Sequence, residues 1–431
     1  MFHKILFLVI FFVSSLAFCA ERDFSFFQKK GDPSAPTLLV IGGVHGDEPG
    51  GYFAPVLMLK HYDIKKGSVY IVPNLNFDSI VANQRGKYGD MNRKFSTIED
   101  KDPDFEHVKR IKEIITLPEV AFVSNLHDGR GFYRHKWESA IFNPSAWGQS
   151  YIIDQKNIED VEFGNLDDIT RQMESILNKD LHENHHSFNI KNTETKEVDE
   201  AMQKSLTYFS ITNLKPAIAV ETSKNITELD LKVIYQLRSF EALMQVMGIE
   251  YTKNIELTRE AVQKSIDEYG TLKLNDRFTV DLSDVKFATR YVPMKKSDNK
   301  IEFSHPLGAV VNRGNYYDIN IGHMRVATIY PQYFDFNCDI KGAKLEIDGK
   351  MKDVSFGDIV EVDKTFKVVS QKGIRVNVIG FVGKDKKSQD NVVIKRSDII
   401  ERFAMDNQNR TFRIEFYDGN NFCGMIGVKF K

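Results

Sequence analysis

The chain has 431 residues, of which 42% are hydrophobic and 27% are charged, and its formal net charge is −2. This length exceeds what one hydrophobic core usually supports, so it predicts two or three domains. The nearly neutral charge gives no reason to expect a nucleic-acid partner, and three cysteines are too few for a disulfide-stapled scaffold.

The first 20 residues have the pattern of a signal peptide. One lysine precedes a short apolar run, and small residues follow it near positions 17–20. The run is short for a membrane-spanning helix, and the rest of the chain offers no second candidate, although an uncleaved anchor is the alternative. We therefore expect cleavage after residues 1–20, export to the periplasm and no transmembrane segment in the mature protein. Cys338 and Cys423 then remain; they could pair in an oxidising compartment, although nothing in the sequence requires it.

Residues 21–250 alternate between strand-like and helix-like segments. Apolar runs typical of buried strands cover 37–44, 68–76, 120–129 and 216–223. Segments with helical apolar spacing or an acidic start cover 50–62, 104–117 and about 166–181. This alternation predicts an α/β domain with a mixed, mostly parallel sheet under helices.

The pattern changes after residue 250. One more helix is predicted over 257–270, and short alternating runs separated by turn signals such as "DGK" and "DGNN" follow it to the end of the chain. Such runs are typical of small β domains. We interpret them as two all-β domains, a barrel at 251–340 and an immunoglobulin-like sandwich at 341–431.

Polar side chains follow three of the predicted strands. His45 and Glu48 come directly after the first strand, His127 ends the third and Glu221 ends the fourth. Ligands of open α/β sheets bind beyond the carboxyl ends of the strands. Two histidines and a glutamate suit zinc and leave one coordination position open. Glu221 then supplies a carboxylate for general-base chemistry.

A polar loop at 76–95, between the second and third strands, contains Arg85, Asn92 and Arg93. Arginine forms bidentate pairs with carboxylates, so the loop is a candidate site for an acidic group of a substrate. The alternative interpretation is a solvated basic loop.

The order of "HGDE", "NQRGKYGDMNRKF", "NLHDG" and "VETS" resembles the zinc metallocarboxypeptidase family, in its short-loop branch with the desuccinylase-type deacylases. The resemblance covers roughly the first 250 residues. It implies that His45, Glu48 and His127 bind Zn²⁺ and that Glu221 is the general base.

The same resemblance implies the substrate contacts. Asn92 and Arg93 match the pair that holds the terminal carboxylate of the substrate, and Arg85 would polarise the scissile carbonyl and stabilise the oxyanion. Arg85 lies closer to Asn92 than in the digestive enzymes of the family, which departs from their pattern. Tyr208 and Tyr133 are the candidates for the tyrosine that caps the substrate.

A signal peptide and two C-terminal β domains most resemble the cell-shape carboxypeptidases of helical bacteria. That resemblance implies a periplasmic, zinc-dependent DL-carboxypeptidase acting on peptidoglycan muropeptides. It would release meso-diaminopimelate from the stem tripeptide and leave a dipeptide ending in D-glutamate, with the tetrapeptide as an alternative substrate. We expect a monomer, although the sequence does not determine the oligomeric state.

Two other functions compete with this interpretation. A zinc deacylase of small N-acyl amino acids would use the same metal ligands, but export argues against it. A non-catalytic cell-wall-binding protein would not need the general base Glu221.

Other polar groups have simpler interpretations. A second H-x-x-E pattern at 135–138 is predicted to be loop, and "HENHH" at 182–186 is predicted to be a solvated surface cluster. Asp47 and Asp128 flank the proposed ligands, where each would either orient a histidine or face water.

Overall fold

The computed structural model describes residues 22–383 and 387–431, so the predicted signal peptide lies outside the described residues. The described chain divides into two compact units, 22–267 and 268–431. Within these ranges, no helix is both long enough and apolar enough to cross a membrane.

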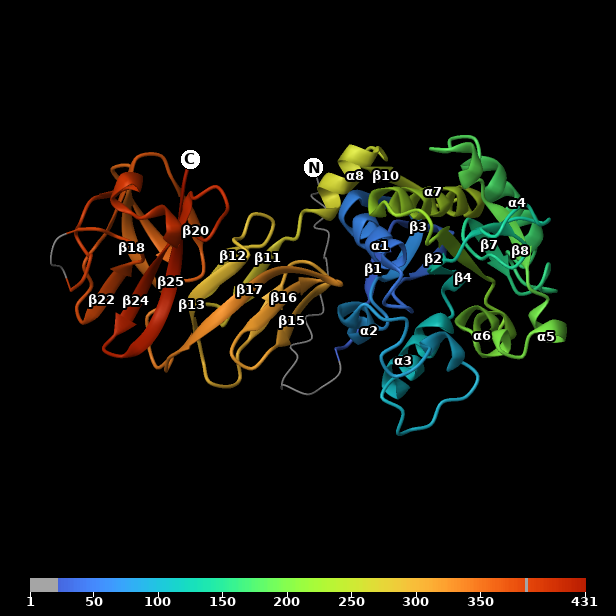
Figure 1. Ribbon diagram of the computed structural model, residues 1–431, viewed down its shortest axis with the longest axis horizontal. Coiled ribbons are helices and arrows are strands. Elements are labelled where there is room, and N and C mark those ends of the chain that lie inside the picture. Colours follow the sequence, from blue (N-terminus) through green and yellow to red (C-terminus); the bar gives the residue numbers. More distant parts are fainter. Residues whose placement is uncertain (1–21, 384–386) are drawn as a thin grey trace. The chain divides into compact units, whose positions relative to one another are not determined.

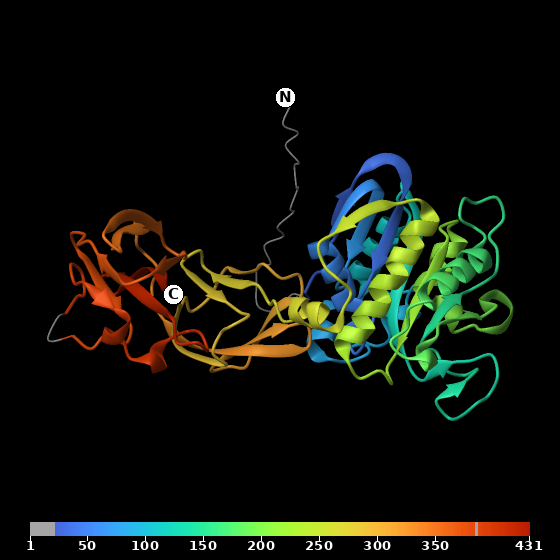
Figure 2. The same ribbon diagram turned by 90° about the horizontal axis from the view of Figure 1, so that it is seen from above.

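The first unit is built on a mixed, eight-stranded sheet (Figures 1 and 2). The strand order is β1-β3-β2-β4-β9-β7-β8, and β10 also pairs with β3. The central strands β3, β2, β4 and β9 run parallel, whereas β1, β10 and β7 join them antiparallel. The predicted mixed, mostly parallel sheet is therefore confirmed. The strands are β1 (Phe27–Lys30), β2 (Asp32–Ile41), β3 (Tyr62–Val72), β4 (Val120–Gly129), β7 (Ser150–Ile153), β8 (Asn189–Asn192), β9 (Ala217–Ser223) and β10 (Glu250–Lys253).

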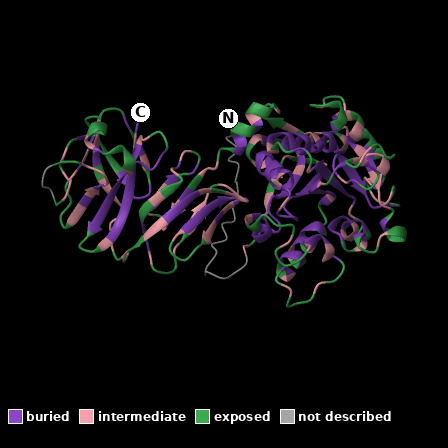
Figure 3. Cartoon of the chain, in the orientation of Figure 1, coloured by how far each residue is buried: buried purple, intermediate pink, exposed green. Residues whose placement is uncertain are grey.

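Helices cover both faces of this sheet. In Figure 1, α1 and α7 lie on one face and α3 and α6 on the other. The central strands are consequently buried on both faces, as Figure 3 shows. This burial explains why their sequences are almost continuously apolar. The helices are α1 (Pro49–His61), α2 (Phe77–Ala82), α3 (Phe105–Ile115), α4 (Leu166–Leu177), α5 (Thr195–Val198), α6 (Leu206–Thr212), α7 (Leu229–Met247) and α8 (Arg259–Ile266).

Short elements fill the long connections of the first unit. Strands β5 and β6 pair in parallel within the segment that follows β4. The elements are β5 (Phe132–Tyr133), β6 (Phe142–Asn143) and the 3₁₀ turns η1 (Met91–Arg93), η2 (Asn184–His186) and η3 (Met202–Lys204).

In the second unit, the described residues form four β-sheets. The first two have the orders β12-β11-β14 and β13-β17-β16-β15. Their strands are β11 (Thr271–Leu274), β12 (Phe278–Asp281), β13 (Ala288–Met294), β14 (Ile301–Phe303), β15 (Gly308–Asn312), β16 (Tyr317–Ile321) and β17 (Met324–Tyr333).

The other two sheets have the orders β19-β18-β21-β23 and β20-β25-β24-β22. One buried apolar cluster draws Leu345 and Phe366 from the first of them and Phe412 and Ile426 from the second, so the two sheets share a core. All-β structure after the α/β unit is thus confirmed, while the barrel, the immunoglobulin-like class and the boundaries at 250 and 340 stay predictions. The strands are β18 (Gly342–Ile347), β19 (Lys350–Ser355), β20 (Ile359–Val362), β21 (Thr365–Val368), β22 (Ile374–Val378), β23 (Ile394–Lys395), β24 (Thr411–Asp418) and β25 (Asn421–Phe430).

The two cysteines that follow the predicted signal peptide form a disulfide. Cys338 precedes β18 and Cys423 lies on β25, with their Cα atoms 5.1 Å apart. The bond closes a loop across a sequence separation of 85, and long loops of this kind lose much chain entropy when they are cross-linked.

We expect replacement of both cysteines by serine to lower the free energy of unfolding of the second unit by about 2–4 kcal/mol. The measurement is chemical denaturation of the parent and the double variant without reductant. Adding reductant should bring the parent to the midpoint of the variant and leave the variant unchanged. Equal midpoints for both proteins in oxidising buffer would show that the disulfide contributes no stability.

Candidate metal centre

The loop between β2 and α1 carries His45 and Glu48 and passes very close to neighbouring backbone. A Cβ atom on Gly46 would lie 2.0 Å from the backbone of Ser79, so only glycine fits there without a backbone shift. Helix α1 then begins at Pro49, whose constrained φ suits the first helical position. The glycine-rich loop therefore holds the side chains of His45 and Glu48 in place at the end of a buried strand.

The register of the sheet brings the other predicted residues to the same edge. Strand β4 lies between β2 and β9 and runs parallel to both. Ile41, the last residue of β2, pairs with Asn125, and His127 pairs directly with Glu221. The carboxyl ends of three adjacent strands therefore meet, as the sequence predicts.

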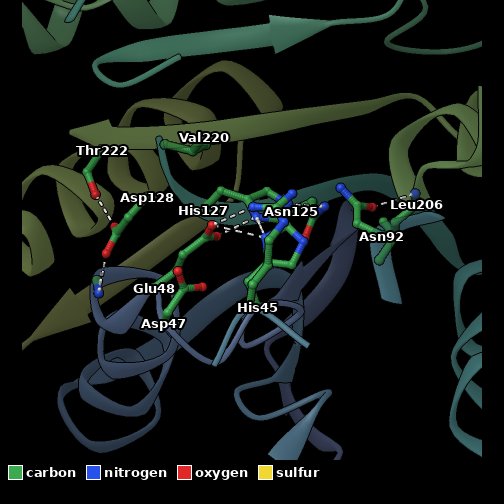
Figure 4. Close-up of polar contacts among 12 residues, drawn as sticks. His45, Asp47, Glu48, Asn92, Asn125, His127, Asp128, Leu206, Val220 and Thr222 are labelled. Atoms are coloured by element: carbon green, nitrogen blue, oxygen red, sulfur yellow. Dashed lines mark hydrogen bonds and ion pairs between the residues drawn. The ribbon is translucent and has the colours of Figure 1, made fainter. Parts of the chain in front are cut away.

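Three donor atoms converge at this edge (Figure 4). The Nδ1 atoms of His45 and His127 are 3.1 Å apart, and the Glu48 carboxylate approaches them to 3.0 Å and 2.7 Å. Each of the three residues is at most 3% exposed. A tetrahedral zinc site with bonds of about 2.0–2.1 Å places its ligand atoms roughly 3.3 Å apart. The imidazole–carboxylate set and its spacing thus fit a divalent transition metal.

The second ring nitrogen of each histidine has its own partner. His45 Nε2 lies 2.9 Å from Asp90 Oδ1, and His127 Nε2 lies 2.8 Å from the carboxamide nitrogen of Asn125. Within the described chain, the buried Oδ1 atom of Asn125 has no hydrogen-bond partner. Turning the amide would let this oxygen accept the Nε2–H of a histidine that coordinates through Nδ1. Asp90 and Asn125 are therefore placed to fix the ring orientations.

Asp90 and Asn125 are the residues that sequence reasoning missed. Asp90 lies inside the polar loop for which the sequence predicts substrate binding, and Asn125 lies within the apolar sequence of a strand. The two flanking aspartates have other roles. Asp47 accepts a hydrogen bond from Lys224 at 2.6 Å, and the buried Asp128 accepts from Gly50 N at 3.1 Å, so neither orients a histidine nor simply faces water.

We expect Asp90→Asn to lower the affinity for a divalent metal ion, measured with Zn²⁺, by about 10–100-fold, because it weakens the acceptor for the ring N–H of His45. The measurement is competition with a chromophoric chelator at constant pH. Asp47→Asn is the matched control, since Asp47 pairs with Lys224 rather than with a histidine, and its affinity should stay close to that of the parent. Equal losses in both variants would contradict the orienting role of Asp90.

Burial and the neighbouring charges act in opposite directions on the ionisation of Glu48 and His45. Burial opposes ionisation of Glu48, but the adjacent imidazoles of His45 and His127 outweigh it and hold the pKa of that carboxyl well below its usual value. Burial likewise opposes protonation of His45, yet Glu48 and Asp90 raise its pKa to about 9. A carboxylate that stays ionised although it is buried is a strong ligand for a cation.

Glu221 lies beside these groups in a different environment. Burial raises its pKa well above the usual range, and the negative charge of Glu48 adds to the effect. A Cβ atom on Gly129, at the end of β4, would lie 2.8 Å from Glu221 Oε2, so the glycine leaves room for this side chain. A buried carboxyl with a raised pKa next to a metal-ligand set is typical of a proton-transfer group.

The polar loop places its basic residues near the same edge. Arg85 Nη1 is 3.4 Å from Glu48 Oε1, and Arg85 Nε donates to Asp90 at 3.0 Å. Asn92 is buried, and its carboxamide oxygen accepts from Leu206 N at 2.9 Å, which leaves the amide nitrogen for a ligand (Figure 4).

The guanidinium of Arg93 lies between the polar loop and η3. It donates to Asn92 O at 2.9 Å and contacts Met202 Sδ at 3.5 Å. No carboxylate of the described ranges forms an ion pair with it, so a half-buried cation is available to an anionic group of a ligand.

Comparison with family models identifies the chain. Residues 3–267 match the model described as "Carboxypeptidase controlling helical cell shape catalytic", which is more than half of the chain. The chain belongs to this family. Residues 336–431 also match the model described as "C-terminal domain of metallo-carboxypeptidase". The resemblance to cell-shape carboxypeptidases is thereby confirmed, and the chain is a metallocarboxypeptidase.

Solved structures of one member of this cell-shape carboxypeptidase family are similar over almost the whole chain. Apo Csd4 from Helicobacter pylori, a "Cell Shape Determinant protein", is 34% identical with a TM-score of 0.91, and the match covers 95% of this chain and 100% of that one. Tripeptide-bound Csd4 is 33% identical with a TM-score of 0.89 over 95% and 100% of the two chains. The mDAP-bound form of Csd4, described as a D,L-carboxypeptidase, is 34% identical with a TM-score of 0.90 over 94% and 100%. A comparison with curated proteins found no match.

Two tyrosines stay candidates for the capping role in this cell-shape carboxypeptidase. Tyr208 lies on α6, two residues after Leu206, whose backbone N–H is held by Asn92. The ring of Tyr133 lies 4.7 Å from the ammonium of Lys191.

The remaining histidine patterns differ from each other. The H-x-x-E pattern at 135–138 is loop, as predicted. In "HENHH", Glu183 and His185 are exposed, but His186 is 5% exposed, so the expectation of a fully solvated cluster is wrong for that residue. His186 is buried because its ring stacks on Phe132.

Proposed function

We propose that this chain is a zinc-dependent DL-carboxypeptidase that removes meso-diaminopimelate from the peptidoglycan stem tripeptide in the periplasm. The observation that carries the proposal is the convergence of two Nδ1 atoms and a buried carboxylate beside Glu221. Membership of the cell-shape carboxypeptidase family and similarity to tripeptide-bound and mDAP-bound Csd4 support the choice of substrate.

In this proposal His45, Glu48 and His127 hold the zinc ion. When bound, zinc supplies Lewis-acid chemistry, which polarises the scissile carbonyl and makes water acidic enough to lose a proton near neutral pH. Asp90 and Asn125 keep the imidazole rings in the orientation that the three donor atoms require.

The other residues of the site act on the substrate and the proton. The positive charge of bound zinc would favour the ionised form of Glu221, so that its carboxylate accepts the proton of the attacking water and passes it to the nitrogen of the leaving diaminopimelate. Arg85 donates hydrogen bonds to the carbonyl oxygen as negative charge develops there. Asn92 and Arg93 hold the carboxylate next to the scissile bond, which confines cleavage to the end of the stem peptide.

Digestion of a muramyl tripeptide tests the proposal, with the products identified by mass spectrometry. We expect free diaminopimelate and a muramyl dipeptide ending in D-glutamate, and no cleavage of the same peptide with an amidated C-terminus. Binding of the tripeptide without cleavage would favour a non-catalytic wall-binding protein. Faster cleavage of small N-acyl amino acids would favour a deacylase.

Removing the Arg93 guanidinium should weaken recognition of the terminal carboxylate. We expect Arg93→Ala to lower kcat/KM for the tripeptide by about 10- to 100-fold, the effect of losing a hydrogen bond to a charged group. Arg171→Ala, which removes a largely exposed arginine from α4, is the matched control and should keep the parent value. An Arg93 variant that still discriminates between free and amidated termini would contradict the assignment.

A further inference from the structure

A second group of metal-ligating side chains lies at the turn η2, separate from the first metal-ligand set. We call Glu183, His185 and His186 the second cluster. Each offers one ligand atom, and these atoms lie within 4.8 Å of one another. The cluster repeats the two-histidine, one-carboxylate composition of the first site, and none of its members enters the proposed hydrolysis.

The buried member of the second cluster is held rigidly. The ring of His186 stacks on Phe132 at 5.8 Å between centroids, and its Nδ1 atom lies 3.0 Å from the hydroxyl of Tyr235. That hydroxyl also accepts the backbone N–H of His182 at 3.1 Å. An imidazole whose one nitrogen is tied to an oxygen presents the other, here Nε2, to a ligand, which is the usual arrangement of a metal-bound histidine.

The two other members lie next to this ring. His185 Nδ1 is 3.1 Å from Glu183 Oε2, and the rings of His185 and His186 meet edge-on at 4.4 Å between centroids. The side chains of His185 and Glu183 are 46% and 53% exposed, so both can turn toward a shared ion without opening the core.

A cavity of about 540 Å³ gives access to the second cluster. Phe132, Ile141, Phe142 and Leu231 supply apolar walls, and Glu228 adds a further carboxylate. Water can therefore reach the coordination positions that three protein ligands leave open.

We propose that Glu183, His185 and His186 bind a second divalent transition-metal ion such as Zn²⁺. Imidazole-rich sets favour zinc, copper or nickel over magnesium and calcium, which take oxygen ligands. Binding is weaker than at the first site, because two exposed side chains lose rotamer freedom here, whereas the ligands of the first site are already buried and oriented. The proposal does not depend on the hydrolytic function.

Zinc stoichiometry tests the proposal. The untagged full chain is stripped with a chelator, equilibrated at buffered free Zn²⁺ concentrations and analysed for bound zinc per chain. We expect two zinc ions per chain, taken up in two separable steps. His185→Ala should lower the affinity of the weaker step by at least about 10-fold. His182→Ala, in the same loop but outside the cluster, should keep both steps.

Two further variants make the assignment specific. Glu48→Ala should abolish the tighter step and keep the weaker one. Glu183→Gln should lower the affinity of the weaker step as His185→Ala does, and it replaces His185→Ala in the test if the His185 variant folds poorly. A single zinc ion per chain at saturation, or an unchanged weaker step in both cluster variants, would overturn the proposal. Tripeptide hydrolysis tests the proposed function separately from the second site. One bound zinc ion per chain with hydrolytic activity would reject only the second site, whereas two bound zinc ions without activity would reject only the proposed function.

Discussion

Glu221→Gln is expected to lower kcat for the tripeptide by about 10²–10⁴-fold, the usual contribution of a positioned acid–base group. Glutamine has nearly the same shape, but it cannot accept the proton of the attacking water or return it to the leaving amine. Glu221 pairs in register with His127 and is buried, so the substitution preserves the shape of the site while removing the titratable group. The measurement is the steady-state rate of diaminopimelate release.

The zinc content of the variant separates loss of the base from loss of the metal. Because none of the three donor atoms of the first site belongs to Glu221, the variant should bind zinc at that site as the parent does. Glu138→Gln, in the exposed loop that carries the second H-x-x-E pattern, is the matched control and should leave kcat unchanged. A kcat of Glu221→Gln within a few-fold of the parent would reject the assigned base.

Glu48→Ala is expected to remove both zinc binding at the first site and activity. Glu48 supplies the only negative charge among the three donor atoms, and its loss leaves two imidazoles facing each other. Loss of an orienting partner alone costs about 10–100-fold in metal affinity, so loss of a ligand should cost at least that much. The measurements are chelator competition for zinc and the rate of tripeptide hydrolysis.

Removal and return of the metal complete this test in the parent protein. A chelator should stop hydrolysis, and added zinc should restore it in the parent but not in Glu48→Ala at the same free concentration. Unfolding curves of both proteins show whether the variant remains folded. Full activity in chelator would contradict metal dependence altogether.

The four central strands of the first unit, β2, β3, β4 and β9, were predictable because they are covered on both faces. A buried parallel strand requires a continuous apolar segment, such as residues 37–44 and 120–129, and the structure places β2 and β4 there. The longest helix, α7, was not predicted. Its burial extends around most of the helix, since it packs against α1, α4 and the sheet, and a helix buried on several sides lacks a clear polar stripe.

For the site itself, the sequence alone determined the chemistry and its order along the chain. The residue types of His45, Glu48, His127 and Glu221, each placed at the end of a readable strand, are enough to predict a metal-dependent hydrolase at one edge of a sheet. These features are local, because a short stretch of sequence is enough to recognise the end of a strand and the polar residue types that follow it.

The tertiary structure decided which polar groups support those ligands. Asp90 rather than Asp47 orients His45, although Asp47 is only two residues away and Asp90 is 45 residues away. It also decided that His186 is buried beside Phe132, where its sequence context indicates a solvated surface. Hydrogen bonds and burial depend on distances of a few ångströms between segments that are remote in the chain, and only the packing of the folded chain sets those distances.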